Sequence, residues 1–301
     1  MKHVRKGAPF LLPLVILLAA FYFLAPISSE PSSVTEIDAL APVEIVADGF
    51  KEPTGVAVDS SGAVFVSDRK AGEALKITGG QVVPFITDLK RPVGLAFDDQ
   101  GRLLIVEEQS GRLLRREAAG SLTVLAEGMK KPRWLAVAED GVIYITAQGS
   151  KDVRGEGVRG EESDDDGDED GEEDGEVILR LTPDALLLTV FADGFKGLQG
   201  ILVHQGNVFA AAKGLKKDKE DQGGIFKIPV LTGGSAGEIA RLTKDKIKKP
   251  FGLIVDALGA LYVSAEEIEL EKKHKDAIGK VAPDGSTVSS PSNGTLTRFA
   301  S

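Results

Sequence analysis

A phrase of about 18 residues recurs five times along the chain and constrains the fold more than any other feature. Each copy has a Pro position, a Gly position two residues later, an apolar stretch, a Gly turn and a second apolar stretch. The copies begin at Lys51, Lys90, Lys130, Lys196 and Lys248. Two further apolar segments follow each copy, so each unit of roughly 40 residues predicts four short strands.

Four short strands per unit, joined by Gly turns, are typical of one blade of a β-propeller. A single blade leaves its faces exposed, whereas blades stacked around an axis cover one another and leave only short edges. The apolar segments are rich in β-branched and aromatic residues, as strands buried on both sides are. The sequence therefore predicts an all-β propeller of four-stranded blades over residues 43–301.

The repeated phrase resembles that of the NHL-repeat and senescence-marker-protein/gluconolactonase superfamily of β-propellers. The copies KEPTGVAVDSSGAVFVSD (51–68) and KKPFGLIVDALGALYVSA (248–265) carry the resemblance. It implies a ring of the six-bladed type, with a ligand-binding or active site on the face that holds the loops between blades. Proteins of this kind include lactonases, lyases, quinoprotein sugar dehydrogenases and binding scaffolds, so the resemblance indicates fold more than function.

The strand count does not match a complete six-bladed ring. The segment VEIVADGF (43–50) reads as a fourth strand before the first full unit, and in related propellers such a strand closes the ring. The chain ends on another fourth strand, LTRFAS (296–301). Either a six-bladed propeller has a truncated C-terminal blade, or five blades close with a spare strand. We favour five full repeats of a truncated six-bladed propeller.

The N-terminal segment, residues 1–27, has the pattern of a membrane anchor or a signal peptide. Three basic residues precede an uncharged apolar run at 8–27. The candidate cleavage sites lack a small residue at the −3 position, so an uncleaved single-pass transmembrane helix is favoured over a cleaved signal. Residues 28–42 read as a tether. The positive flank predicts a propeller on the extracytoplasmic side of the membrane; the alternative is a secreted or periplasmic protein.

The charge is concentrated in one place. Residues 161–176 hold twelve carboxylates and no base, and without them the net charge moves from −10 to +2. This balance indicates no nucleic-acid partner. The chain has no Cys, which excludes disulfides, Cys-ligated metals and a cysteine nucleophile.

Length variation also concentrates on one face. Extra residues follow the second strand at 148–176 in the third unit, 213–223 in the fourth and 266–278 in the fifth. In a propeller these loops share a face with the loops between blades, and insertions on one face often mark the functional side. Neutral growth of surface loops is the alternative.

Basic residues recur on the same predicted face. A lysine precedes every Pro position by two residues, and a second base follows it at Arg91, Lys131 and Lys249. The third unit also carries an unusual pair, Arg133 and Trp134, which could form a stacking platform or fill space left by the missing Gly. The candidate binding residues are therefore Lys51, Lys90, Lys130, Arg133, Trp134, Lys196, Gln199 and Lys248, around an anionic small molecule, a polysaccharide or a protein partner.

Candidate metal ligands are few. Asp68 and Glu107 end second strands and offer hard oxygen atoms for a divalent cation such as Ca²⁺, although solvated strand-end carboxylates are the simpler interpretation. Asp166, Asp168 and Asp170 match the start of a calcium loop, but Val177 stands where its bidentate Glu belongs, so only weak cation binding is expected.

Three functional classes follow. A membrane-tethered binding module leads, because the residues do not complete a catalytic constellation. A metal-dependent hydrolase of the gluconolactonase-like type is the alternative, although the Glu and Asn that the resemblance implies as metal ligands are missing. A quinoprotein-type sugar oxidoreductase is least supported. His204 falls in a turn on the opposite face, and His274 lies in the fifth-unit insertion among lysines, which should depress its pKa.

Overall fold

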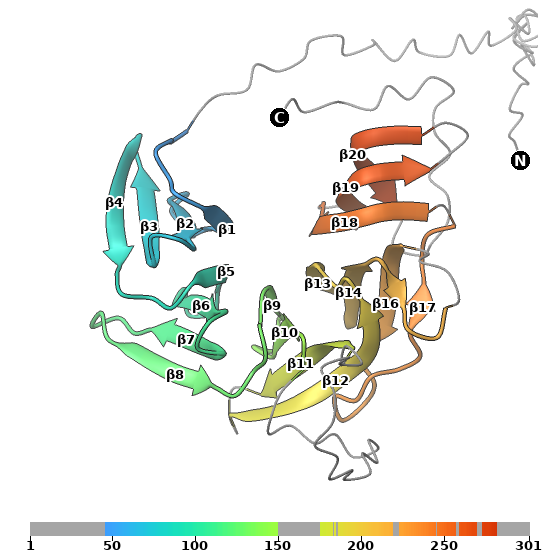
Figure 1. The fold of residues 1–301 in the computed structure, drawn as a ribbon. Coiled ribbons are helices and arrows are strands. Elements are labelled where there is room, and N and C mark those ends of the chain that lie inside the picture. The colour runs from blue at the N-terminus through green and yellow to red at the C-terminus, as the bar shows by residue number, and fades with distance from the viewer. Residues whose placement is uncertain are drawn as a thin grey trace, which may run out of the picture. The chain divides into compact units, whose positions relative to one another are not determined.

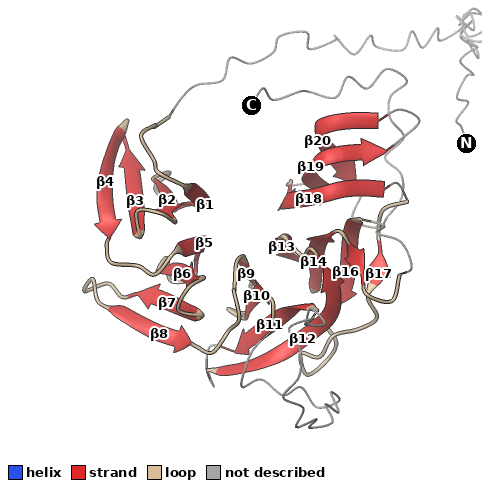
Figure 2. Cartoon of the chain, in the orientation of Figure 1, coloured by secondary structure: helices blue, strands red, loops and turns tan. Residues whose placement is uncertain are grey.

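The structure is a computed structural model that describes the backbone of residues 46–149, 175–182, 184, 186–218, 223–244, 246–256, 259–269 and 273–281. The chain divides into two units, Met1–Val43 and Glu44–Ser301, and the described residues belong to the second. Every regular element among them is a β-strand (Figure 2). The prediction of an all-β propeller is confirmed.

The first two repeats each form a four-stranded antiparallel sheet with its strands in chain order. Blade 1 consists of β1 (Pro53–Val58), β2 (Val64–Asp68), β3 (Glu73–Thr78) and β4 (Gln81–Ile86). Blade 2 consists of β5 (Pro92–Phe97), β6 (Leu103–Glu107), β7 (Arg112–Arg116) and β8 (Leu122–Ala126). In both, the first strand begins at the Pro of the repeat and the second ends at its carboxylate.

The later repeats vary the same plan. Blade 3 consists of β9 (Leu135–Val137), β10 (Ile143–Ala147), β11 (Glu176–Thr182) and β12 (Leu187–Lys196), with β15 (Gly214–Leu215) added at the outer edge. Blade 4 consists of β13 (Gly200–His204), β14 (Asn207–Ala212), β16 (Gly224–Pro229) and β17 (Ala240–Arg241). The described part of blade 5 consists of β18 (Lys246–Val255), β19 (Leu261–Glu269) and β20 (Lys273–Val281).

The first strands of successive blades pack against one another at a common centre, in the order β1, β5, β9, β13 and β18 (Figure 1). Each blade therefore presents the loop that enters its first strand to the centre of the same face.

The Pro-x-Gly part of the repeat forms a bulge at this centre. In blade 1 the strand register shifts between Pro53 and Val56. A Cβ on Gly55 would lie 2.1 Å from the carbonyl oxygen of Val93 in blade 2, so glycine is needed for this approach. The buried Ser67 hydroxyl accepts the Gly55 N–H at 2.7 Å and donates to the Val93 carbonyl oxygen at 2.6 Å. One hydroxyl thus provides the acceptor for the N–H group in the bulge and links blade 1 to blade 2 by a hydrogen bond.

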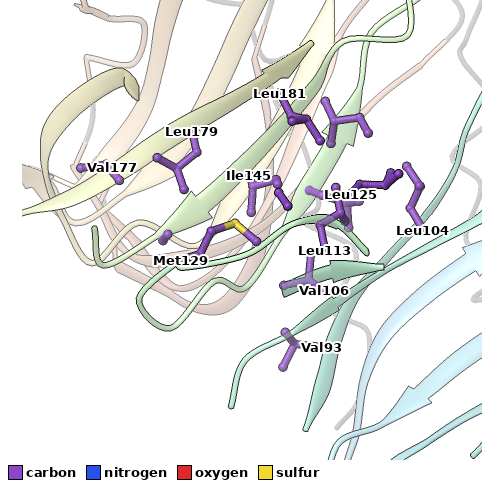
Figure 3. Close-up of a cluster of buried hydrophobic side chains, with 14 residues drawn as sticks. Val93, Leu104, Val106, Leu113, Leu125, Met129, Ile145, Val177, Leu179 and Leu181 are labelled. Carbon is purple, nitrogen blue, oxygen red and sulfur yellow. The ribbon is translucent and has the colours of Figure 1, made fainter. Parts of the chain in front are cut away.

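Apolar side chains fill the space between neighbouring blades. Figure 3 shows the cluster between blades 2 and 3, in which Leu104 and Val106 of β6 pack with Ile145 of β10 and Leu179 of β11. All four are fully buried. Equivalent clusters lie between blades 1 and 2, 3 and 4, and 4 and 5. Burial of this kind is the main force that holds a propeller together, and it fixes the loops of the central face on a rigid base.

Two predictions about local structure were wrong in detail, and the closing strand remains a prediction. Residues 46–50 pair with no described strand, but residues 43–45 and the C-terminal residues 282–301, where a partner would lie, are outside the described residues. Part of the 213–223 segment is not loop but strand β15. The expected insertion at 266–278 is instead a continuation of β19 and β20. Ile268 joins the cluster between blades 4 and 5, and its burial extends these strands past the point where other blades turn.

The predicted anchor, the tether and LTRFAS (296–301) lie outside the described residues, as does most of the acidic stretch. Within the part of the chain that is described, no helix has the length and hydropathy of a membrane span.

Candidate functional site

Loops from blades 1, 2 and 3 meet in a pocket of about 430 Å³ on the central face. We call it the outer pocket; its lining residues are Arg69, Arg91, Glu108, Gln109, Lys131 and Arg133. They come from the loops after β2 and β6 and from those that enter β5 and β9. The expectation that these two kinds of loop share one face is confirmed for the first three blades.

A second pocket of about 250 Å³ adjoins the first, and we call it the inner pocket. Its lining residues are Thr54, Arg69, Val93, Glu108, Arg133, Trp134 and Gln199. The two pockets share two guanidinium groups and one carboxylate, so a single ligand can occupy both.

Arg69 is the most firmly held cation of the outer pocket. Its Nε–H and Nη2–H donate to Glu108 Oε2 at 2.9 and 2.7 Å, and its Nη1–H donates to Glu52 Oε1 at 2.5 Å. Burial lowers the pKa of Arg69, but the hydrogen bonds to the two carboxylates outweigh it, and the pKa lies above its usual value. This network joins blade 1 to blade 2, and its charge is compensated.

The other three cations are held less firmly. Arg91 Nε lies 3.3 Å from Glu108 Oε2, on the oxygen that Arg69 already occupies. Lys131 and Arg133 have no ion pair and no side-chain hydrogen bond among the described residues. Four cationic side chains therefore line the outer pocket together with one carboxylate, and two of the four are uncompensated.

The repeat explains why Lys131 is uncompensated. The residue before each Pro is matched by the residue that follows the position of Asp68, Glu107, Ala147 or Ala265 in the same blade. Three blades place opposite charges at these two positions, in the ion pairs Glu52–Arg69 (2.5 Å), Arg91–Glu108 (3.3 Å) and Lys249–Glu266 (2.6 Å). In blade 3 the second position holds Gln148, whose N–H donates to the Lys130 carbonyl oxygen at 2.8 Å. A neutral amide thus stands where blades 2 and 5 have a carboxylate.

The backbone of Arg91 and Lys131 has an unusual conformation. Arg91 and Lys131 have φ angles of 55° and 43°, in the left-handed region, and each directly precedes a proline. This conformation is costly for a residue with a Cβ, on the order of 1–2 kcal/mol. Lys249 of blade 5 has the same conformation, with φ of 45°, and lines neither pocket. The conformation therefore belongs to the repeat, and it sets the direction of the chain before the Pro in these three blades.

Asp68 and Glu107, the predicted metal ligands, are buried and bonded to backbone and hydroxyl donors. Asp68 accepts the N–H groups of Lys51, Glu52 and Ala71 at 2.6, 3.1 and 2.9 Å. Burial raises the pKa of Asp68, but these three donors outweigh it and the pKa lies below its usual value. Asp68 therefore holds in place Lys51 and Glu52, which lead into β1, and the loop that follows β2.

Glu107 has the same role in blade 2. Its carboxylate accepts the Lys90 N–H at 2.6 Å and the Ser110 hydroxyl at 2.5 Å. Neither carboxylate lines a pocket of the central face. A metal-binding role for them remains a prediction, and so does binding by Asp166, Asp168 and Asp170, which lie outside the described residues.

A divalent cation does not fit the central face as it is described. Its pockets contain a single carboxylate, Glu108, which already accepts hydrogen bonds from Arg69. Across the described residues no three His, Asp or Glu side chains come together as a metal site. Calcium prefers six to eight oxygen ligands, and a pocket lined by four cations repels it.

The predicted binding residues divide into two groups. Arg133, Trp134 and Gln199 line the pockets. The recurrent lysines do not: Lys51, Lys90, Lys130 and Lys248 are exposed beside the face, and Lys196 is half-buried. Their binding role remains a prediction. Sequence reasoning overlooked Arg69 and did not link Glu108 to it, although both directly follow a strand-end carboxylate.

Trp134 lies between the inner pocket and the core, and its role as a stacking platform remains a prediction. It lines the inner pocket, and it also packs against the apolar cluster between blades 3 and 4. Among the described residues, its buried Nε1–H has no hydrogen-bond acceptor. His204 ends β13 and lines neither pocket, and its buried Nε2 also has no hydrogen-bond partner in the described part of the chain. His274 lies in β20, where only the backbone is described.

Solved structures with this arrangement of strands include proteins of three kinds. A gluconolactonase from Xanthomonas campestris is 20% identical, with 80% of this chain and 75% of that chain covered and a TM-score of 0.59. Regucalcin, a calcium-binding protein from Agrobacterium tumefaciens, is 14% identical over 80% and 74%, with a TM-score of 0.54. Nidogen, in a complex with laminin, is 17% identical over 74% and 76%, with a TM-score of 0.53.

These likenesses concern the fold. No protein-family model and no curated protein matches the sequence. An enzyme, a calcium-binding protein and a protein that binds another protein all share the architecture, so the chemistry must be argued from the pocket. The structural neighbours of this chain are gluconolactonase- and regucalcin-like propellers and NHL-like propellers, and it shares their fold of four-stranded antiparallel blades.

Proposed function

We propose that the chain is a binding module that takes up an anionic ligand in the outer pocket of its central face. One observation carries the proposal: Lys131 and Arg133 line a pocket with Arg69 and Arg91, and neither has a partner of opposite charge among the described residues. A pocket with surplus positive charge attracts anions and raises their local concentration.

The size and chemistry of the pocket suit a small molecule or one group of a larger one. Its volume of about 430 Å³ falls within the usual range of ligand sites. Guanidinium groups offer planar pairs of N–H donors that match carboxylate and phosphate oxygens. Because the face is open, the anion could equally be one group of a polysaccharide or of a protein partner.

The sequence supports a location for this activity. We propose that residues 8–27 tether the protein to the membrane and that the propeller lies on the extracytoplasmic side. The basic residues that precede the apolar run support this orientation. The central face would then sample anions outside the cytoplasm.

Titration calorimetry of the purified full chain with inorganic phosphate tests the proposal. We expect binding at low salt that weakens sharply at about 0.5 M NaCl, because surface charges are then screened. The double variant Lys131→Ala/Arg133→Ala should weaken binding by about tenfold or more. The matched control Lys70→Ala/Lys217→Ala removes two exposed lysines that line neither pocket and should leave it unchanged. Equal losses in both double variants would contradict the proposal.

A metal-dependent hydrolase of lactones is the second candidate, and the likeness to gluconolactonase favours it at the level of the fold. Regucalcin likewise raises calcium as a candidate ion. Lactone hydrolysis releases protons, so it can be followed in a pH-stat assay of the full chain with glucono-δ-lactone and Ca²⁺, Zn²⁺, Mn²⁺ or Mg²⁺. This assay decides between the binding module and the hydrolase. Chelator-sensitive turnover that disappears in Glu108→Gln would replace the binding module with the hydrolase.

A further inference from the structure

The charges of the outer pocket can be counted against their partners. Arg69 is compensated by Glu52, and Arg91 by Glu108, which Arg69 and Arg91 share. Lys131 and Arg133 remain, with no compensating carboxylate among the described residues. Among the described residues, the surplus in and around the pocket is therefore two positive charges.

We infer that the anionic group recognised here is a dianion of the phosphoryl type, namely the phosphate of a small monoester. This inference rests on the proposed function, because it specifies the ligand of the same pocket. Two negative charges neutralise the surplus, and a phosphate monoester carries about two at neutral pH because its second pKa is near 6.

The arrangement of the donors favours a tetrahedral group. Arg91 enters the pocket from the loop before β5, whereas Lys131 and Arg133 enter from the loop before β9. Three terminal oxygens can meet donors from both loops at once, while a carboxylate offers only two oxygens in one plane. Arg supplies paired N–H donors and Lys a compact charge, and both are common at phosphate sites.

The inner pocket indicates what the phosphate is attached to. Beyond the shared Arg69, Arg133 and Glu108, its lining is uncharged: Thr54, Val93, Trp134 and Gln199. It offers no further cation for a second phosphate. The remainder of the ligand is therefore a small neutral group with apolar and hydroxyl surface, and a polyphosphate is disfavoured.

One substitution tests the charge count without removing any lining residue. Gln148→Glu places a carboxylate where blades 2 and 5 have Glu108 and Glu266, which pair with the preceding cation at 3.3 and 2.6 Å. The new carboxylate should pair with Lys131 and cancel half of the surplus. The control Gln205→Glu adds the same charge to an exposed turn between β13 and β14.

The experiment compares five probes on the full chain by titration calorimetry at pH 7.5 and low salt. Glucose 6-phosphate carries about two charges and glucose 6-sulfate one charge in the same tetrahedral geometry. Glucarate carries two charges on two carboxylates, gluconate carries one charge on a carboxylate, and glucose carries none. We expect the phosphate to bind about tenfold or more tightly than the sulfate. Gln148→Glu should remove most of that advantage, while Gln205→Glu keeps it and both variants retain the parent melting temperature.

The outcomes separate this inference from the proposed function. Equal affinity for the phosphate and the sulfate would overturn the dianion, while anion binding in the pocket would stand. Glucarate, a dicarboxylate, binding as tightly as the phosphate would overturn the phosphoryl group. If no anion binds the parent chain, the proposed function fails as well.

Discussion

Lys131 of blade 3 and Lys249 of blade 5 occupy the same position of the repeat and differ in what surrounds them. Both precede a proline in left-handed backbone, with φ of 43° and 45°. Lys249 Nζ lies 2.6 Å from Glu266, whereas Lys131 lines the outer pocket beside Arg133. The repeat thus fixes the position of the cation in each blade. The residue at the position of Gln148 and Glu266 determines whether the cation forms an ion pair within its blade or can bind a ligand.

The largest expected difference between blades is in the free energy of unfolding when a glycine at the centre of the face is replaced. In Gly94→Ala the new Cβ would lie 2.5 Å from the Arg133 carbonyl oxygen and 2.8 Å from Leu135 Cδ2. We expect a loss of about 2–4 kcal/mol in the free energy of unfolding, because backbone must move to relieve the clash. Among the described residues, a Cβ on Gly252, at the same repeat position in blade 5, would meet only Ser264 Oγ at 3.3 Å. Gly252→Ala should therefore lower the free energy of unfolding in urea by less than Gly94→Ala does.

The strand-end carboxylates provide the next contrast, because blade 1 has Asp68 where blade 5 has Ala265. Asp68→Ala leaves three backbone N–H groups without their acceptor, so we expect a loss of about 2–3 kcal/mol in unfolding free energy. The equivalent change in blade 5 cannot be made, since alanine is already there.

Asp68 also predicts a pH dependence. Its pKa is lower in the folded chain, so its contribution to stability is present above the usual pKa of about 4 and is lost as the pH falls below it. Thermal unfolding from pH 6 to pH 3 measures this loss. Asp68→Asn should start less stable and lose less on acidification; a parallel decline in both proteins would contradict the assignment.

The comparison of the two lysines can be sharpened with glycine, which adopts positive φ without strain. We expect Lys131→Gly to change the unfolding free energy by less than about 1 kcal/mol, because relief of strain offsets the added freedom of the unfolded chain. Phosphate binding should fall by about tenfold, since one uncompensated cation is lost. Lys249→Gly should leave phosphate binding unchanged, and an equal loss there would break the distinction.

The smallest effect belongs to the ion pair of blade 5. The hydrogen bond from Lys249 lowers the pKa of Glu266, but the pair is exposed to solvent. Glu266→Gln should therefore leave the melting temperature unchanged at physiological salt. It would uncover Lys249, so any gain in phosphate affinity would show how readily this repeat position becomes a binding site.

The sequence predicted the blades well because their strand ends carry distinct residues. Pro53 and Pro92 begin first strands, and Asp68 and Glu107 end second strands, so boundaries as well as strands could be read. The extension of β19 and β20 was missed, because the burial of Ile268 depends on packing against blade 4.

The site was predicted only in part. Arg133, Trp134 and Gln199 occupy the positions that face the centre of the ring, which the repeat identifies, and they line the pockets. The lysine two residues before Pro was favoured over the base that follows it. The φ angles of Arg91 and Lys131 set the actual direction of the loop, and no spacing in the sequence encodes them.

The four apolar clusters between blades have a consequence for how the protein opens. Each cluster contains middle strands of two neighbouring blades, such as β6 and β10, which are buried along their whole length. The outer strands β4 and β8 are exposed or half-buried over most of their length. Segments with few buried contacts open more easily than segments in the core. Amide hydrogens of β6 and β10 should therefore exchange with solvent most slowly, and those of β4 and β8 earlier. The loops that carry Glu108 and Lys131 are thus anchored to the last part of the propeller to exchange.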